Sequence, residues 1–375
     1  MASFNVSFEN PVSFYFEGEK IIAKVEVNVE NDVEIKWLTA SIRCTCKCIE
    51  EKPSETNSSS IWHVVLPGKS EVKKNYFDFN DLVYSINENK TNRLLPGTHQ
   101  FMIECQLPSF SPSSIESSDA YVRYFTLITG DIDNEIVKKI QYFTVVSKVD
   151  LNKQKTNTSS FISMYENVRP ISCAFTFGNL FSLSCFRYGH IRAFLHIDKR
   201  SYVPGEEIKM DAEIINLCNH PVDWVKAVFV QIIKFTCSKF NKRKRIVHEV
   251  TRGCVMPNDS QIWKNEGFPV PALPPTTIDS SKILISVCYK LYLEVKPSWK
   301  DKPMVTKTKL IIGSIPMREI DKSDEIGQGD VCNFSSKDLE IFNFEPCFFG
   351  PYDVEDEGDV TPFAPMYPVY EISDE

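Results

Sequence analysis

The chain has 375 residues, a net charge of −8 at pH 7 and 42% hydrophobic residues, which is enough apolar material for two packed domains. The acidic balance argues against a dedicated nucleic-acid binder, whose domains are usually basic, so no nucleic-acid partner is predicted. Residues 1–10 lack the features of a signal peptide, and no apolar run is long enough to span a membrane, so we expect a cytoplasmic protein.

A stretch near the start of the chain recurs later at a constant offset of 187 residues. A tryptophan held in register across such a duplication is hard to obtain by chance, because Trp is rare. The chain is therefore predicted to contain two related units in tandem, too few for a solenoid. The recurring residues are Tyr15, Gly18, Glu19, Ile21, Glu26, Trp37 and Ala40, matched by Tyr202, Gly205, Glu206, Ile208, Glu213, Trp224 and Ala227.

Each copy begins with an aromatic residue, a Gly-Glu turn and a strand. Residues 21–29 alternate between apolar and polar side chains, as a half-buried strand does. Gly18 and Gly205 stand where a tight turn is expected to need a positive φ. We predict that Trp37 and Trp224 fill equivalent positions in the two cores.

Cysteines follow along the next predicted strand of the first copy. Cys44, Cys46 and Cys48 alternate, so their thiols should share one face and act as small hydrophobic groups. A zinc site would need a turn that brings about four ligands together, so neither a metal nor another cofactor is predicted. Because the chain is long and shows no export signal, its 12 cysteines are expected to be free thiols.

Composition divides the chain into four regions. Residues 1–150 are predicted as a first β-sandwich lobe, 151–184 as an interdomain linker and 185–345 as a second lobe, whose strand over residues 282–295 is long enough for a large sandwich. Residues 346–375 hold eight acidic residues, five prolines and neither Lys nor Arg. We interpret this last region as an extended acidic tail with aromatic anchors, not as a folded unit.

A basic cluster stands out in this acidic protein, in a predicted hairpin between strands 225–236 and 246–251. Such a cluster could bind anionic lipid headgroups, inositol phosphates, a phosphorylated cargo tail or the chain's own acidic tail. A solvated turn without a ligand is the alternative. The cluster consists of Lys239, Lys242, Arg243, Lys244 and Arg245.

Catalytic patterns are missing from the sequence. The six histidines form no His-Glu-x-x-His motif, and no glycine loop for phosphates is present. Carboxylates paired in a flexible tail cannot hold catalytic geometry. No enzymatic activity is predicted.

A series of short motifs resembles the arrestin family, and within it the arrestin-domain-containing proteins (α-arrestins). Each motif is weak alone, and their order and spacing carry the resemblance. In the first lobe they are residues 95–101, 107–108, 112–116 and 121–124, and in the second lobe residues 202–206, 273–276, 286–289 and 310–316.

This resemblance implies an all-β protein with two tandem arrestin-like, immunoglobulin-like antiparallel β-sandwich lobes and an acidic C-terminal tail. It also implies a non-enzymatic cytoplasmic adaptor that links membrane-protein cargo tails to a ubiquitin ligase or to endocytic machinery at the plasma membrane or endosomes. An arrestin-fold structural subunit of a coat or sorting complex, as in retromer, is the alternative. An extracellular adhesion module is a weaker third reading.

Two departures from relatives limit what the resemblance implies. The short segment 277–282 leaves no room for the acidic loop of visual and β-arrestins, so their phosphorylation-triggered switch is not expected. α-Arrestins commonly recruit WW-domain ligases through Pro-Pro-x-Tyr, whereas residues 364–367 read Ala-Pro-Met-Tyr. Because a WW groove needs the first proline, we expect weak or no WW binding, and we expect Phe363, Pro365, Tyr367 and Tyr370 to dock on the parent lobes instead.

Overall fold

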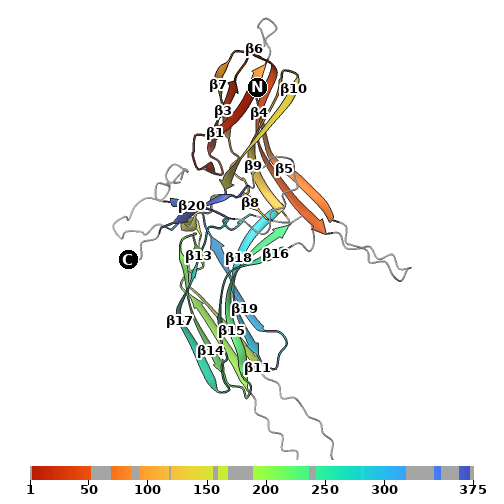
Figure 1. Ribbon diagram of the computed structural model, residues 1–375. Coiled ribbons are helices and arrows are strands. Elements are labelled where there is room, and N and C mark those ends of the chain that lie inside the picture. Colours follow the sequence, from red (N-terminus) through yellow and green to blue (C-terminus); the bar gives the residue numbers. More distant parts are fainter. Residues whose placement is uncertain are drawn as a thin grey trace, which may run out of the picture.

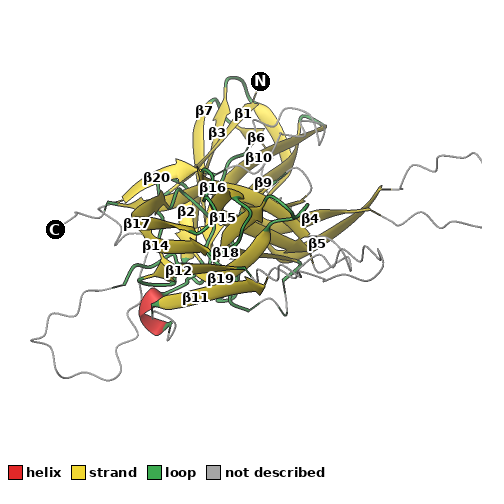
Figure 2. Ribbon diagram, turned by 90° about the horizontal axis from the view of Figure 1, so that it is seen from below, coloured by secondary structure: helices red, strands yellow, loops and turns green. Residues whose placement is uncertain are grey.

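A computed structural model describes residues 2–51, 69–85, 93–117, 120–154, 159–167, 189–235, 242–279, 281, 283–317, 342–347 and 363–371. Among these residues almost all regular structure is β-strand, and η1 (Leu151–Lys153) is the single helical turn (Figure 2). Two lobes lie end to end, and a small ribbon of strands lies at their junction (Figure 1).

The first lobe is a sandwich of two sheets, with strand orders β1-β3-β7 and β2-β10-β9-β4-β5, to which β6 and β8 add short edges. All of its pairings are antiparallel except that of β2 with β10, which is parallel. Its strands are β1 (Ala2–Phe8), β2 (Phe14–Phe16), β3 (Lys20–Val29), β4 (Val33–Glu51), β5 (Lys69–Ser85), β6 (Arg93–Leu94), β7 (Gly97–Gln106), β8 (Ile115–Glu116), β9 (Ala120–Ile132) and β10 (Glu135–Val146).

The second lobe repeats this plan, with strand orders β11-β12-β14-β17 and β13-β19-β18-β15-β16 and a parallel pairing of β13 with β19. The sequence assigned residues 160–167 to the linker, but they form β11 and pair along β12. The strands are β11 (Ser160–Asn167), β12 (His190–Ile197), β13 (Ser201–Tyr202), β14 (Glu207–Asn216), β15 (Val222–Phe235), β16 (Lys242–Arg252), β17 (Asp259–Pro269), β18 (Ile285–Pro297) and β19 (Met304–Ile312).

The repeated Gly-Glu turn has the same geometry in both lobes. Gly18 has φ 75° and Gly205 has φ 98°, in the region that favours glycine. The carboxylates of Glu19 and Glu206 each accept a hydrogen bond from the backbone N–H three residues earlier, at 3.0 and 2.9 Å. The sequence repeat at the constant offset of 187 residues therefore corresponds to one turn geometry that occurs in both lobes.

A second repeated motif joins each loop to its closing strand. Tyr124 and Tyr289 are buried, and each donates its hydroxyl to a proline carbonyl, at 2.7 and 2.6 Å. Two residues after each proline, the hydroxyls of Ser114 and Thr276 accept a backbone N–H from the last strand of the lobe, at 2.9 and 2.8 Å. These bonds fix the ends of both sandwiches close to the junction.

The tryptophan prediction is wrong in one respect. Trp37 and Trp224 do lie on corresponding strands, β4 and β15, but both are partly exposed and neither belongs to the core. The strand register shifts immediately before each tryptophan, and this bulge leaves Leu38 and Val225 as the fully buried residues. The ring of Trp224 instead forms a cation–π contact with the Lys226 ammonium, which lies 5.4 Å from the ring centroid.

The cysteine stripe lies inside the first lobe. Cys44, Cys46 and Cys48 are fully buried on one face of β4, and the eight cysteines that the structure describes are free thiols. Burial raises the pKa of the Cys44 thiol to about 12, so this group stays protonated and acts as a small hydrophobe.

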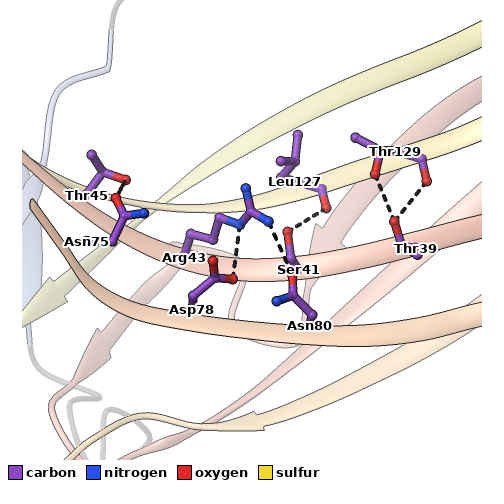
Figure 3. Close-up of polar contacts among 9 residues, drawn as sticks. All are labelled: Thr39, Ser41, Arg43, Thr45, Asn75, Asp78, Asn80, Leu127 and Thr129. Atoms are coloured by element: carbon purple, nitrogen blue, oxygen red, sulfur yellow. Dashed lines mark hydrogen bonds and ion pairs between the residues drawn. The ribbon is translucent and has the colours of Figure 1, made fainter. Parts of the chain in front are cut away.

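The opposite face of β4 is polar, and its side chains form hydrogen bonds with the adjacent strands. Figure 3 shows alternate side chains of β4 bonded to the neighbouring strands β9 and β5. Thr39 contacts the Thr129 hydroxyl at 2.8 Å, and Arg43 donates to the Asp78 carboxylate at 3.1 Å. Arg43 on this face is therefore paired with an acidic side chain of the neighbouring strand β5.

Candidate functional site

The C-terminal region forms a ribbon at the junction of the lobes (Figure 1). β20 (Phe342–Pro346) pairs antiparallel with β21 (Met366–Tyr370), so these parts of the region are folded, contrary to the expectation of a wholly extended tail. The ribbon positions the aromatic residues of β21 for contact with both lobes.

Polar contacts attach β21 to the first lobe. Tyr367 is 1% exposed, and its hydroxyl donates to the backbone carbonyl of Ser114. The neighbouring Met366 N–H donates to Thr144 Oγ1 at 3.0 Å. Ser114 and Thr144 lie on segments bonded to each other, so the tail binds an already rigid part of the lobe.

Aromatic contacts extend this attachment on both sides of β21. The ring of Phe363 stacks on Tyr142, with centroids 5.1 Å apart and planes at 27°. The ring of Phe344, on β20, lies 4.9 Å from that of Phe14. Ring pairs of this kind contribute about 0.5–1.5 kcal/mol beyond the area that they bury.

The last residue of β21 attaches the ribbon to the second lobe. Tyr370 is 5% exposed, its N–H donates to the Pro204 carbonyl at 2.9 Å, and its hydroxyl donates to the Ser314 carbonyl. Its ring packs with Leu151 and Val203 in a small separate core. β21 therefore contacts the first lobe through Tyr367 and the second through Tyr370, three residues later.

Ser314 also joins the two lobes directly. Its hydroxyl donates to the Ser147 carbonyl and accepts the Val149 N–H, both at 2.8 Å. Because Tyr370 binds the carbonyl of this same residue, the tail is anchored on the hinge between the lobes. A second direct bond runs from the Leu284 N–H to the hydroxyl of Tyr76 on β5.

Gly205 allows the close approach of the tail. A Cβ atom on Gly205 would lie 2.0 Å from the Tyr370 carbonyl oxygen, a distance that no side chain can occupy. A Cβ atom on Gly18, in the matching turn, would have its nearest neighbour 3.8 Å away. The glycine of the second turn thus serves both the turn and the tail.

Burial fixes the protonation of both tail tyrosines. Desolvation raises the pKa of Tyr367 well above its ordinary value, and it also raises the pKa of Tyr370. Both hydroxyls therefore remain donors at neutral pH, as their carbonyl partners require.

A buried ion pair lies beneath the Phe363 contact. Arg123 donates to both carboxylate oxygens of Glu116, at 2.8 and 2.7 Å, and its guanidinium lies 3.9 Å from the Tyr121 ring centroid. Burial raises the pKa of Glu116, and Arg123 opposes that shift. The same guanidinium lies 5.9 Å from the Tyr142 ring on which Phe363 stacks, so the Tyr142 ring connects the tail to this ion pair.

The structure splits the basic cluster between two faces. Lys239 lies outside the described residues. Arg245 faces Gln231, which is buried, and its Nη1 lies 3.9 Å from the Cys347 sulfur next to β20. Since side chains alternate along a strand, Arg243 shares the face of Arg245.

Lys242 and Lys244 lie on the outward face, where other strands add more lysines. Lys242 is paired with Lys234 of β15, and the Lys244 ammonium lies 5.7 Å from the Tyr292 ring of β18. Partial desolvation, together with the ammonium groups of Lys307, Lys242 and Lys234, lowers the pKa of Lys290. We call this set the lysine face; it consists of Lys234, Lys242, Lys244, Lys290 and Lys307.

Comparison with known families agrees with the two-lobed architecture. Residues 4–152 match the model of the arrestin (or S-antigen) N-terminal domain, and residues 187–317 match that of the arrestin (or S-antigen) C-terminal domain. The chain belongs to the arrestin family. The first match ends at residue 152 and the second begins at residue 187, so residues 153–186 lie between the two matched domains.

Curated relatives place this arrestin among the arrestin-domain-containing proteins. It is 25% identical over 323 residues to arrestin domain-containing protein 17 of Caenorhabditis elegans, an alignment that covers 84% of this chain and 70% of the relative. It is 22% identical over 229 residues to arrestin domain-containing protein 4 of Mus musculus, covering 60% of this chain and 50% of the relative. The chain thus spans only half of the mouse protein.

Arrestins are in general non-enzymatic adaptors. In the described part of this arrestin, no group of three or more His, Cys, Asp or Glu side chains is arranged to hold a metal ion. Within the same residues, the structure contains no helix with the length and apolar character needed to cross a bilayer.

Sequence reasoning did not find the partners of the tail tyrosines. Ser114 and Ser314 accept through backbone carbonyls, which no side-chain pattern reveals. The sequence did indicate Gly205 as a turn residue, because it recurs at the offset of the duplication. It did not indicate the contact with Tyr370, which has no counterpart at Gly18.

Proposed function

We propose that this arrestin is a non-enzymatic adaptor that links membrane-protein cargo to endocytic sorting or ubiquitination, and that its docked tail regulates access by its partners. Membership of the arrestin family supports the adaptor role in general. The observation that carries the regulatory part is the attachment of β21 to both lobes, through Tyr367 and Tyr370.

Docking hides the degenerate WW motif. Pro365 and Tyr367 are both buried, and the Pro365 carbonyl accepts the Cys347 N–H at 3.0 Å. A WW groove must enclose the tyrosine of its ligand, which is impossible while Tyr367 is docked. The docked form therefore does not present this motif, and ligase recruitment requires release of the tail or another segment.

The lysine face gives the adaptor a surface for an anionic membrane. Its ammonium groups come from β15, β16, β18 and β19 and face outward together. Each basic residue near an anionic membrane surface contributes about 1 kcal/mol. Contact through this face would hold the second lobe against the plasma membrane or an endosome, where cargo tails emerge.

Titration of isolated WW domains tests the regulatory part. Wild-type protein should bind weakly or not at all. An Ala364→Pro variant restores Pro-Pro-Met-Tyr, and we expect it to bind strongly only when Tyr370→Ala also releases the tail. Strong binding by the wild type, or by Ala364→Pro alone, would show that docking does not hide the motif.

Proximity labelling in cells tests the adaptor part. Wild-type protein should label membrane proteins together with ligases or endocytic factors, and truncation before Pro346 should change that set. Phe110→Ala is the control, because this side chain is 88% exposed and takes no part in the tail contacts described above. Absence of membrane proteins from the labelled set would contradict the proposal, and stoichiometric co-purification with a large sorting assembly would favour a structural subunit instead.

A further inference from the structure

The outward face of the sheet β11-β12-β14-β17 is unusually apolar. Antiparallel sheets with one face on the core normally present polar side chains on the other. Here Phe161 is 66% exposed, Ile262 59% and Tyr165 54%. Large apolar residues grouped on one exposed face indicate a binding surface more often than scattered ones do.

A groove of about 480 Å³ runs between these side chains. Ala212 and Trp263, both 3% exposed, contribute to its lining, and Phe161, Phe194 and Ile262 are the more exposed lining groups. The rings of Phe161 and Phe194 lie 5.6 Å apart at 31°, as one continuous aromatic surface. The groove is of the size that encloses one or two side chains of a peptide.

A β-bulge shapes this groove. The register of β14 against β17 shifts between Met210 and Ala212, and Asn265 adopts φ 50°. The Asn265 N–H donates to the Asp211 carboxylate at 2.8 Å, which holds Asp211 at the rim. Bulges of this kind re-aim side chains at functional surfaces.

The charges that line the groove are mainly negative. Asp211 and Glu213 are adjacent outward-facing residues of β14, and Lys264 contributes the single ammonium group of the lining. Asp198 lies 3.8 Å from His196 Nδ1, which is itself 3.9 Å from Asp211, so a third carboxylate stands close by. Carboxylates beside aromatic rings suit a cationic side chain, through ion pairing and cation–π attraction.

We propose that this groove binds a partner peptide in which an aromatic or branched apolar side chain stands next to a lysine or arginine. The apolar side chain would lie against Phe161, Phe194 and Ile262, and the cation against Asp211 and Glu213. This inference rests on the proposed adaptor function, because it names the chemistry of a segment that such an adaptor holds. It is independent of the lysine face, which belongs to the other sheet and has the opposite charge.

Fluorescence anisotropy with the full-length chain tests it directly. The probes are two labelled peptides that differ only in charge, Gly-Lys-Phe-Lys-Ile-Gly and Gly-Glu-Phe-Glu-Ile-Gly. Wild-type protein should bind the cationic peptide about tenfold more tightly than the anionic one. Equal affinities would overturn the proposal.

Matched variants locate the binding. Ile262→Ser should weaken binding of the cationic peptide about fivefold, and Asp211→Asn with Glu213→Gln should abolish the charge preference. Ile136→Ser, at a residue 68% exposed on β10 of the first lobe, should change nothing. Unchanged binding by Ile262→Ser would overturn the proposal, and thermal melts would show that each variant is folded.

Two other occupants of the groove would also overturn it. A dimer in analytical ultracentrifugation that Ile262→Ser dissociates would assign the groove to a second copy. Binding of the cationic peptide only after residues 170–186 are replaced by a Gly-Ser linker would assign it to the chain itself. Failure of these binding experiments leaves the adaptor function standing, since proximity labelling does not depend on this groove.

Discussion

The two Gly-Glu turns share one geometry and differ in what covers them. Gly18 donates its N–H to the Pro108 carbonyl at 3.1 Å, and Gly205 donates to that of Val270 at 2.8 Å. The first turn leaves space beside its glycine, whereas the second is in contact with the backbone of Tyr370. Both lobes contain the turn, although only the second turn has its glycine against the tail. The turn is therefore part of the lobe fold itself and does not depend on the tail. The tail binds both lobes, but of the two turn glycines only Gly205 lies against it.

This difference teaches how a duplicated fold becomes asymmetric. Each lobe repeats the same hydrogen bonds at its turn and at its closing strand, and none of these bonds involves the tail. The tail then joins Ser114 of the first lobe to Ser314 of the second, through backbone carbonyls that face the junction. The following predictions test that asymmetry.

Truncating Tyr370, which lies against the second turn, should have the largest effect on tail docking. Tyr370→Ala deletes a ring that is 5% exposed, together with its hydrogen bond to Ser314. We expect a loss of about 3–5 kcal/mol of docking free energy, as for other buried aromatic truncations. Limited proteolysis within β21 should become rapid, while Phe110→Ala should leave it slow. Equal cleavage of the two variants would contradict the account.

Matched substitutions of the two glycines come next. Ala at either position has an unfavourable positive φ, at a cost of about 1–2 kcal/mol. Gly205→Ala should lose about 1–2 kcal/mol more, because its methyl group displaces the Tyr370 backbone. Urea unfolding followed by Trp fluorescence measures the difference. Equal destabilisation by Gly18→Ala and Gly205→Ala would remove the asymmetry.

Alkaline pH should release the tail gradually. Because burial raises the pKa of Tyr367 and Tyr370, the docked state favours the protonated phenols. Docking is therefore fully stable below the ordinary tyrosine pKa of about 10 and weakens above it, by up to about 1.4 kcal/mol per pH unit for each group.

Proteolysis of the tail between pH 8 and pH 11 measures this release. A variant carrying Tyr367→Phe and Tyr370→Phe should have a weaker tail attachment that no longer depends on pH in this range. The same pH profile in both proteins would show that these hydroxyls do not control docking.

The smallest predicted effect concerns membrane binding by single substitutions on the outward faces of the two lobes. Lys242→Ala and Lys244→Ala should each reduce binding to liposomes with anionic lipid by about 1 kcal/mol, most strongly at low salt. Arg43→Ala, on the corresponding face of the first lobe, should have no effect because Arg43 is paired with Asp78. Arg243→Ala should also have little effect, since it lies on the other face of β16. A uniform loss across all four variants would contradict the lysine face.

Sequence patterns predicted the two β-sandwich lobes well, because the residues that define them recur at regular spacings. The offset between the copies and the cysteine stripe both depend on positions that repeat regularly. The prediction for Trp37 and Trp224 was wrong because a bulge changes which residue of the strand faces the core, and a bulge leaves no periodic signal. The second repeated motif, with Tyr124 and Tyr289, lies within the family motifs found in the sequence, but its repetition was not predicted because its offset differs from that of the turns.

The candidate site was less accessible to sequence reasoning. Aromatic residues in an acidic tail indicated docking, but the acceptors of Tyr367 and Tyr370 are carbonyl groups. The basic cluster was read as one patch, whereas alternation along β16 places Arg245 near Cys347 and Lys244 on the outer face. Lys290 joined the lysine face only once the sheet order was known.

Amide hydrogen exchange at β21 tests the central claim most directly. The N–H groups of Met366 and Tyr370 donate to Thr144 and Pro204, on different lobes. In the wild type we predict that both exchange at least about a hundredfold more slowly than in a free tail peptide, which corresponds to about 2.7 kcal/mol. Gly205→Ala should reduce this protection about five- to thirtyfold, and Gly18→Ala should retain it. Exchange of both amides at the free-peptide rate in the wild type would show that the tail does not join the lobes.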